Sequence, residues 1–235
     1  MKVICTILAR GGSTGVKNKN IKPLLGKPLI EYTIEQAIES KEFYKIAVNS
    51  DSDDILNVAS KYPEVELVKR PKKFANDTIS KRPAIRQSVN EIEEKYSINF
   101  DIVVDLDCTS PLRDTRDISN SLKQFKSDNN DNLITAMDAR RSPYFNMVEV
   151  TKKNEVKLVK ELESAITCRQ DAPKCYDMNA SIYIWKKNIL FGTESNYLKD
   201  KTGLYIMPEE RSIDIDTEVD FKIVEFFLKG KSVNK

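Results

Sequence analysis

The first part of the chain shows two distinct patterns of apolar and polar residues. Residues 3–9 form a continuous apolar and β-branched run, which indicates a strand buried on both faces of a sheet. From Ile30 to Ile38 the apolar side chains recur at helical spacing and lie on one stripe. Residues 45–51, KIAVNSD, then indicate a second strand with a polar end. This order predicts a unit of strand, helix and strand.

The same alternation continues to about residue 138. Helical spacing recurs at 52–62, at 80–96 and from about Asp114, and strand-like apolar runs recur at 65–68, 100–107 and 132–138. Strands that alternate with helices are typical of α/β proteins with a largely parallel sheet. We therefore predict an α/β fold.

The pattern changes between Ala139 and Trp185. Short β-like runs at 144–150, 155–159 and 181–185 are joined there by charged residues. Because hairpins need only short turns and no helical crossover, this stretch predicts a small antiparallel β insertion at 139–185. Residues 217–230 then form an amphipathic pattern, which we interpret as a final helix that ends at Gly230.

Length and charge narrow the class of protein. The 235 residues suit a single domain with a sizeable insertion. Lys and Arg number 38 against 36 for Asp and Glu, so a net charge of +2 gives no argument for binding to nucleic acid or to a membrane surface. No window reaches the roughly 18 apolar residues of a membrane span, and no cleavage site follows the first apolar run. We expect a soluble, cytoplasmic protein with neither nucleic acid nor membrane as partner.

Metal sites built from cysteine and histidine are not supported by the sequence. The chain has no histidine, and its four cysteines form no CxxC pair. We expect reduced thiols. Without histidine, a general base would be a carboxylate, a metal-bound hydroxide or a bound nucleotide itself.

Residues 8–24, LARGGSTGVKNKNIKPL, form a glycine-containing loop after the first strand. The loop does not match the phosphate-binding P-loop, because no lysine follows its second glycine directly, nor the dinucleotide turn, because no helix follows Gly15. A loop with Arg10, Lys17, Lys19 and Lys22 at the carboxyl end of a strand suits a triphosphate. A solvated, lysine-rich loop is the alternative.

Two carboxylate pairs are candidates for chemistry. Asp214 and Asp216 in IDID point the same way if the segment is extended, and paired carboxylates are suitable Mg²⁺ ligands. The alternative is that Asp216 or Thr217 caps the final helix, with Asp220 in its first turn. Asp105 and Asp107 form the second pair, at the end of a buried strand.

Five ordered blocks of sequence carry a family resemblance. They are LARGGSTGVKNKNIKPLLGKPLIEYTI at 8–34, KRPKKFANDTIS at 69–80, TSPLRD at 109–114, RQDAPKCYDMNASIYIW at 169–185 and SIDIDTEVDF at 212–221. Together they resemble the CMP-sialic acid synthetase family of cytidylyltransferases, which activate nonulosonic acids, and LDCTSPLR looks most like the CMP-legionaminic acid synthetase branch. The chain departs from the family at Thr14, at Asp107-Cys108 and at Ala180-Ser181, where the family usually has a basic residue, Gln-Pro and Gly-Ala.

The resemblance implies a fold, an activity and a set of site residues. The fold would be a three-layer, Rossmann-like nucleotidyltransferase with a central, mostly parallel mixed sheet. The reaction would couple CTP to the anomeric hydroxyl of a legionaminic or sialic acid, with pseudaminic acid and Kdo as further possibilities, and would release pyrophosphate. The implied residues are Leu8, Ala9, Arg10, Gly11, Gly12, Ser13, Lys19, Asn20, Arg70 and Ser80 for CTP, Asp107, Arg169 and Gln170 for the sugar, and Asp214 and Asp216 for Mg²⁺.

In this hypothesis Arg10, Lys19, Asp214 and Asp216 carry the catalysis. The resemblance also implies a homodimer in which the insertion at 139–185 reaches over the partner's active site. Two other functions remain open from the sequence. One is a nucleotidyltransferase that uses another nucleotide and a sugar phosphate, and the other is a nucleotide-binding regulatory protein without turnover.

Overall fold

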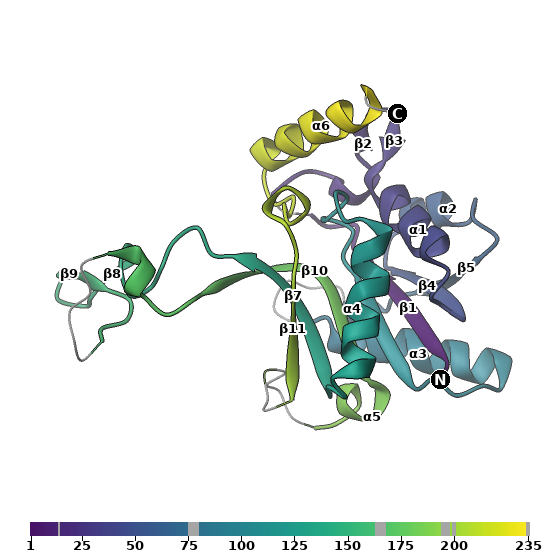
Figure 1. The fold of residues 1–235 in the computed structure, drawn as a ribbon. Helices are drawn as coiled ribbons and strands as arrows, with labels where there is room; N and C mark the ends of the chain where they lie inside the picture. Colours follow the sequence, from purple (N-terminus) through teal and green to yellow (C-terminus); the bar gives the residue numbers. More distant parts are fainter. Residues whose placement is uncertain (14, 75–79, 163–167, 194–197, 199–200, 234–235) are drawn as a thin grey trace.

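A seven-stranded mixed sheet forms the centre of the molecule (Figure 1). The computed structural model describes residues 1–13, 15–74, 80–162, 168–193, 198 and 201–233. The strand order in the sheet is β11-β7-β10-β6-β1-β4-β5. The strands are β1 Val3–Leu8, β4 Lys45–Ser50, β5 Val65–Lys69, β6 Ile102–Leu106, β7 Asn132–Asp138, β10 Tyr176–Lys186 and β11 Thr202–Ile206.

All neighbouring strands pair in parallel except β10, which runs antiparallel to both β6 and β7. The prediction of a mostly parallel mixed sheet is therefore confirmed. β10 reverses direction because it enters the sheet from a hairpin-like excursion rather than from a crossover helix. The carboxyl ends of the six parallel strands meet at one edge, where α/β sheets usually bind their ligands.

Helices cover both faces of the sheet and complete three layers. One face packs against α1 Leu29–Ser40, α2 Asp53–Ala59 and α4 Thr115–Ser127. The other face packs against α3 Arg82–Tyr96 and the short α5 Lys187–Leu190. Within β1, Cys5 contributes to the first core and Ile4 to the second, as the alternation of side chains along a strand requires. The predicted helices and strands of residues 3–138 all form.

Asp114 begins α4 with a capping box. Its carboxylate accepts a hydrogen bond from the Arg116 amide at 2.9 Å, and Asp117 accepts one from the Asp114 amide at 2.9 Å. These bonds satisfy amide groups that a helix otherwise leaves open. The predicted start of this helix is confirmed.

The last helix, α6 Glu218–Val233, lies over the hairpin of β2 Pro23–Leu24 and β3 Lys27–Pro28 (Figure 1). A small core joins them, in which Leu24 and Leu29 meet Ile215, Phe221 and Val224. The predicted end at Gly230 is wrong, because the helix continues through this glycine to residue 233. A glycine within a helix costs about 1 kcal/mol but does not by itself end it.

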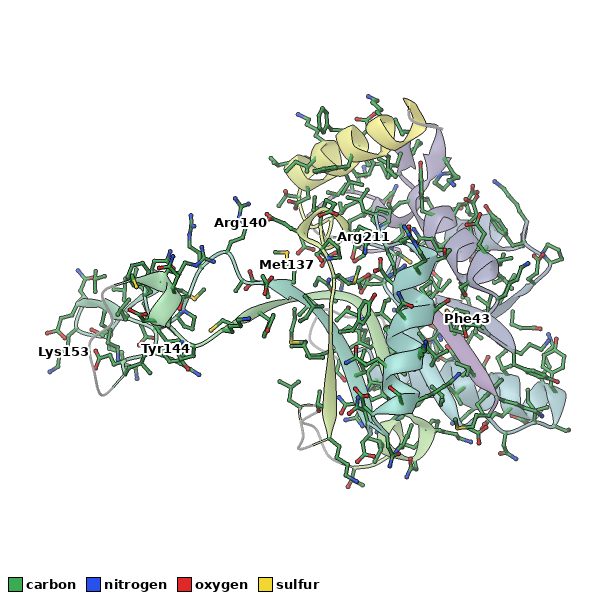
Figure 2. The ribbon with its side chains drawn as sticks, in the orientation of Figure 1. Phe43, Met137, Arg140, Tyr144, Lys153 and Arg211 are labelled. Carbon is green, nitrogen blue, oxygen red and sulfur yellow. The ribbon has the colours of Figure 1, made fainter. Side chains whose placement is uncertain are left out.

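The insertion forms an arm that projects away from the sheet (Figure 1). Its tip carries an antiparallel pair, β8 Val148–Val150 and β9 Val156–Leu158. Figure 2 shows Tyr144 and Lys153 on this arm, far from Phe43 in the body, and Arg140 where the arm leaves the sheet. An antiparallel insertion was predicted, but its boundary at residue 185 was wrong. Residues 182–186 pair with β6 inside the central sheet, so the arm ends earlier.

In the part of the chain that the structure describes, no helix is long and apolar enough to cross a membrane.

Candidate active site

The residues singled out from the sequence fall at two places in one protomer. Most lie at the carboxyl edge of the sheet, and two lie on the arm. The edge holds Leu8 at the end of β1, Ala9, Arg10, Gly11, Gly12 and Ser13 in the following loop, Lys19 and Asn20 in a 3-10 turn at Lys19–Ile21, Arg70 after β5, Ser80 before α3, Asp107 after β6, and Asp214 and Asp216 before α6.

The loop after β1, residues 9–18, is fixed by hydrogen bonds to its neighbours at the same edge. The Ala9 amide donates to the Asn49 carbonyl oxygen at 3.1 Å, and the Asn20 side chain donates to the Arg10 carbonyl oxygen at 3.0 Å. The Gly11 amide donates to Asp51 Oδ1 at 3.0 Å. One of the amides predicted to face phosphate is thus engaged by a carboxylate. Thr14, where the sequence departs from the family, lies outside the described residues.

Gly15 allows the loop to approach the segment that carries Asp216. A Cβ atom at Gly15 would lie only 2.1 Å from the Asp216 carbonyl oxygen. Carbon and oxygen atoms do not approach so closely, so this position admits no side chain without movement of the backbone. The loop after β1 and the acidic segment are therefore packed directly against each other.

Lys19 links the same two segments by charge. Its ammonium donates to the Ile215 carbonyl oxygen and lies 3.4 Å from Asp216 Oδ1. The Lys19 side chain is 13% exposed, whereas that of Asp216 is 78% exposed. The structure thus brings together two residues that the sequence separates by almost the whole chain, and it places a held cation beside an accessible carboxylate.

Asp214 and Asp216 flank Ile215, whose side chain is fully buried in the core under α6. Because successive side chains of an extended segment alternate, the two carboxylates lie on the side away from that core. The cap of α6 is formed by other residues. Asp220 accepts bonds from the Thr217 amide at 2.7 Å and hydroxyl at 2.8 Å, and the Asp220 amide donates to the Thr217 hydroxyl at 3.3 Å. Neither of the two aspartates is needed for capping.

Asp214 is poised to accept a positive charge. Its Oδ1 is buried and has no hydrogen-bond partner among the described residues. Burial, with the nearby charges of Asp107 and Asp216, raises the pKa of Asp214 to about 6. A buried carboxylate oxygen without a donor suits a divalent cation. No cluster of three metal-ligating side chains occurs among the described residues, so two carboxylates would leave the remaining ligand positions to phosphate and water.

Arg70 lies nearly buried after β5. Its Nε donates to Asn49 Oδ1 at 2.6 Å and its Nη2 donates to the Asn49 carbonyl oxygen at 2.9 Å. Burial lowers the pKa of Arg70 from its ordinary value, and the acidic groups of Asp51 and Asp105 oppose that effect. Arg70 therefore fixes the end of β4 beside the loop after β1. Ser80, which the resemblance implied for CTP, is exposed before α3.

A compact charged cluster follows β6. Lys81 Nζ lies 2.9 Å from Asp105 Oδ2 and 3.2 Å from Asp107 Oδ2. Thr109 donates to Asp107 Oδ1 from its amide at 3.2 Å and from its hydroxyl at 2.9 Å. Burial opposes the charge of Lys81, but the two carboxylates outweigh it and raise the pKa of this lysine. Despite its burial, Lys81 and Thr109 lower the pKa of Asp107, so Asp107 stays a charged carboxylate. That charge in turn helps to raise the pKa of Asp214.

Arg169 and Gln170 do not join this edge in the same protomer. Both are exposed on the arm, in a 3-10 turn at Arg169–Asp171. Arg169 Nη2 donates to the Ala139 carbonyl oxygen at 2.6 Å, and the two residues line a cavity of about 470 Å³ together with Arg141 and Lys174. The sugar-binding residues predicted from the sequence are therefore split between the body, which holds Asp107, and the arm.

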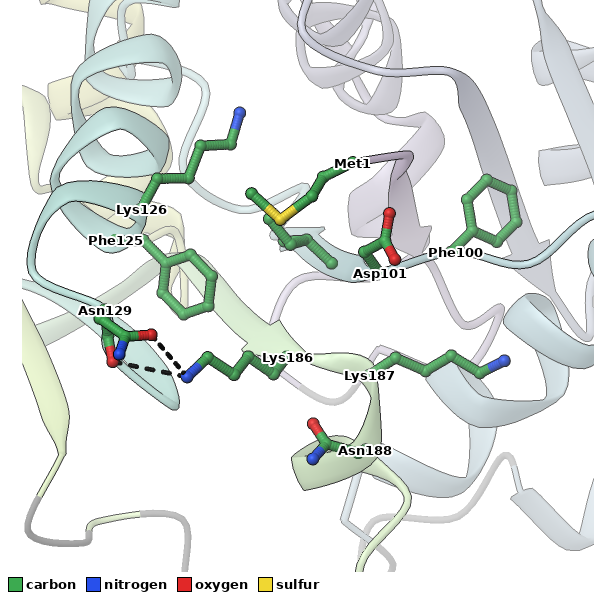
Figure 3. A pocket seen from close by; sticks show the side chains of 10 residues that line it. Met1, Phe100, Asp101, Phe125, Lys126, Asn129, Lys186, Lys187 and Asn188 are labelled. Carbon is green, nitrogen blue, oxygen red and sulfur yellow. Dashed lines mark hydrogen bonds between the residues drawn. The ribbon is translucent and has the colours of Figure 1, made fainter.

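A second cavity, of about 430 Å³, lies at the opposite end of the sheet (Figure 3). It is lined by the amino ends of β1 and β6, near Phe100 and Asp101. Two of its three lysines have structural partners: Lys186 donates to Asn129 Oδ1 at 3.0 Å, and Lys187 pairs with Glu93 at 2.6 Å. This cavity is far from the strand ends that hold the candidate site residues.

Sequence reasoning missed Lys81 and Thr109 as members of the site and assigned no role to Arg113. Lys81 precedes an Arg-Pro pair and is typical of a solvated helix start, so its sequence neighbours give no signal of its pairing with Asp105 and Asp107. Thr109 lies in the block TSPLRD, but only the fold shows that it contacts Asp107. Asp51, which engages the loop after β1, was also missed.

Comparison with known proteins gives the family. A model of the cytidylyltransferase family matches residues 4–231. The chain belongs to the cytidylyltransferase family. It is 46% identical over 233 residues to CMP-N,N'-diacetyllegionaminic acid synthase of Campylobacter jejuni, with 99% of this chain and 97% of that protein covered. The post-translational flagellin modification protein B of Campylobacter coli is 46% identical over 232 residues, with the same coverage.

A solved structure has the same fold. The structure of CMP:2-keto-3-deoxy-manno-octonic acid synthetase complexed with CTP matches this cytidylyltransferase with a TM-score of 0.66 at 16% identity. The match covers 98% of this chain and 100% of that one. At this identity the likeness bears on the fold alone, and the predicted nucleotidyltransferase fold is confirmed.

Proposed function

We propose that this cytidylyltransferase couples CTP to the anomeric hydroxyl of a nonulosonic acid, with legionaminic acid as the preferred acid, and releases pyrophosphate. The observation that carries the proposal is the packing of the loop after β1 against the segment of Asp214 and Asp216, linked by Lys19. The name of the Campylobacter jejuni relative supports the acid class.

The nucleotide side of the reaction needs positive charge and amide donors around a triphosphate. Attack on the α-phosphorus expels pyrophosphate, so negative charge develops on the leaving group as well as on the attacked phosphate. In our proposal Lys19, Arg10 and the amides of Gly12 and Ser13 in the loop after β1 bind the phosphates. Asn20 and Arg70 lie beside that loop and would hold the nucleoside, directly or through Asn49.

Asp214 and Asp216 fit a magnesium ion. The unpartnered buried oxygen of Asp214 and the exposed carboxylate of Asp216 provide hard oxygen ligands close to Lys19. When bound, Mg²⁺ would neutralise charge on the phosphates. The protein's own contribution is to hold these carboxylates on one side of Ile215 while Thr217 and Asp220 cap the helix.

The acid side of the reaction would use two protomers. Arg169 suits the carboxylate of the acid, because a guanidinium can donate two parallel hydrogen bonds to it. Since Arg169 and Gln170 lie on the projecting arm, we propose that the arm of a partner protomer carries them to the site beside Asp107. Val148, Val150 and Val156 at the arm's tip are 58%, 64% and 68% exposed, an apolar surface that a homodimer would cover.

A panel assay tests the proposal. The protein is incubated with Mg²⁺, each of the four nucleoside triphosphates, and one acceptor from a panel of legionaminic acid, sialic acid, pseudaminic acid, Kdo and a sugar phosphate. Pyrophosphate release is then measured. We expect release only with CTP and fastest release with legionaminic acid. Release with another nucleotide and a sugar phosphate would favour the alternative nucleotidyltransferase. Nucleotide binding without release under any condition would favour a regulatory protein.

The role of the arm is tested by mixing two inactive variants. Arg169→Ala removes the carboxylate ligand of the arm, and Asp216→Asn removes a carboxylate from the body. If the arm acts on a partner, a mixture of the two variants contains heterodimers with one intact site and regains up to about one quarter of wild-type activity. Arg141→Ala, on the same arm, is the matched control for changes in assembly. A mixture that stays inactive, although the protomers exchange, would contradict the proposal.

A further inference from the structure

Arg113 is buried beneath the candidate site without a carboxylate partner. Arg113 is 2% exposed, and in the described part of the chain no carboxylate lies within ion-pair distance of its guanidinium. Burying a guanidinium without an ion-pair partner is costly, and the more distant charges of Asp107 and Asp117 offset that cost only in part, since burial lowers the pKa of Arg113. If Arg113 contributed only to stability, an apolar side chain of similar size would serve as well or better. The buried guanidinium therefore needs another explanation.

The guanidinium joins three segments of the chain. Nη1 donates to the Ser181 carbonyl oxygen at 2.5 Å and to its hydroxyl at 3.1 Å. Nη2 donates to the Asp107 carbonyl oxygen and to Thr33 Oγ1, both at 3.2 Å. The Asp107 amide also donates to the Ser181 carbonyl oxygen at 3.1 Å. Arg113 thus ties the turn after β6 to β10 and to α1.

Two of the three tied segments lead to a residue proposed to act on the acid, Asp107 at this protomer's own site and Arg169 at the site of its partner. The turn after β6 carries Asp107 and Thr109. Ser181 lies in β10, the strand that returns from the arm with Arg169. At this point β10 has an irregular register between Met178 and Tyr183, so main-chain pairing alone does not fix the strand.

The bulge is held by side chains on its other flank as well. Asn179 Oδ1 accepts a bond from Thr135 Oγ1 at 2.6 Å, and Asn179 Nδ2 donates to Ser212 Oγ at 2.9 Å. Ser212 begins the segment of Asp214 and Asp216. The bulge therefore connects the arm, the turn after β6 and the acidic segment.

The backbone of Arg113 is fixed from behind by α1. Gln36 Nε2 donates to the carbonyl oxygens of Pro111 and Arg113, each at 2.8 Å. The guanidinium is consequently presented by a rigid support, as preorganised sites require. None of the side chains proposed to bind CTP is among its hydrogen-bond partners.

We infer that Arg113 is a positioning residue for the acid substrate, which sets the turn of Asp107 and the β10 bulge relative to each other. This inference rests on the proposed function. The inference predicts different effects on the two substrates. Loss of the guanidinium weakens use of the acid and leaves CTP binding unchanged. A misplacement of about 1 Å in such a site is enough for a large loss of rate.

The test compares Arg113→Met and Arg113→Lys with wild type. We expect Arg113→Met to raise the KM for the acid at least tenfold, while the Kd for CTP, measured by calorimetry, stays within twofold. Arg113→Lys is expected to recover part of the loss, because an ammonium reaches fewer of the four acceptors. Arg116→Met is the matched control, since Arg116 is an exposed arginine with 79% of its side chain accessible.

A second variant keeps the inference testable if Arg113→Met fails to fold. The double variant Thr33→Val with Ser181→Ala retains the guanidinium but removes two of its acceptors, and we expect a roughly fivefold rise in the KM for the acid. Equal changes for CTP and acid, or an unchanged KM for the acid in folded variants, would overturn the inference. A wild-type protein without acid-dependent release would instead refute the proposed function.

Discussion

Gly15→Ala tests whether the loop after β1 must touch the acidic segment. The added Cβ would lie 2.1 Å from the Asp216 carbonyl oxygen, whereas real Cβ contacts are essentially never under 3.0 Å. The backbone must therefore separate by about 1 Å, which shifts Lys19 and Asp216 relative to each other. A shift of this size costs roughly 10²-fold in rate when it misplaces reacting groups. Forced packing of this kind also destabilises by about 1–3 kcal/mol.

Gly230→Ala is the matched control, because Gly230 is exposed in α6 and a Cβ there meets nothing within 4 Å. The assay is steady-state pyrophosphate release with CTP and acid, together with thermal unfolding of each variant. We expect kcat/KM to fall about 100-fold in Gly15→Ala and to stay within twofold of wild type in Gly230→Ala. The helix of the control gains about 0.5–1 kcal/mol. If Gly15→Ala kept more than a third of wild-type kcat/KM, the packing argument would be refuted.

Three further predictions concern stability. Ala180 has a φ of +52°, so Ala180→Gly relieves strain and raises the free energy of unfolding by about 0.5–1 kcal/mol net of glycine's chain entropy; an unchanged or lower Tm would contradict this. The pKa of Asp214 is raised to about 6, so the folded state binds its proton more tightly and the wild type loses stability as pH rises from about 4 to 6. In the absence of metal, we therefore expect Asp214→Asn to be more stable than wild type at pH 8, by up to about 2–3 kcal/mol, and equally stable at pH 3. The variant should also be inactive. Urea unfolding at both pH values checks the sign of the stability change. Thr217→Ala removes the α6 cap and costs about 1 kcal/mol by the same measurement, and no loss would show that Asp220 alone holds the helix start.

The parallel part of the fold could be predicted because its elements are local. The apolar run of β1 and the stripe of α1 specify a strand and a helix through their spacing alone, and the capping residues of α4 mark its start. The end of the insertion could not be predicted in this way. The sequence shows a β-like run only at 181–185, whereas the strand begins at Tyr176, which already pairs with β7, and the bulge beside Ala180 lies inside this one strand.

The candidate site was only partly visible in the sequence. The loop after β1 and the IDID segment have recognisable compositions, but the contact between Lys19 and Asp216 depends on how α6 packs over the β2 and β3 hairpin. Lys81 and Arg113 read as ordinary surface cations. The ion pairs of Lys81 and the burial of Arg113 depend on carboxylates and carbonyl groups that the fold brings from other segments, which no local pattern encodes.

Transfer of the α-phosphorus tests the central claim most directly. The protein is incubated with CTP labelled with ³²P at the α-phosphate, Mg²⁺ and legionaminic acid, and the products are separated and counted beside the pyrophosphate released. We predict that the label enters a CMP conjugate of the acid in a one-to-one ratio with pyrophosphate, and that no label leaves CTP when the acid is omitted. Label found only in CMP or CDP, or release that does not depend on the acid, would contradict the account.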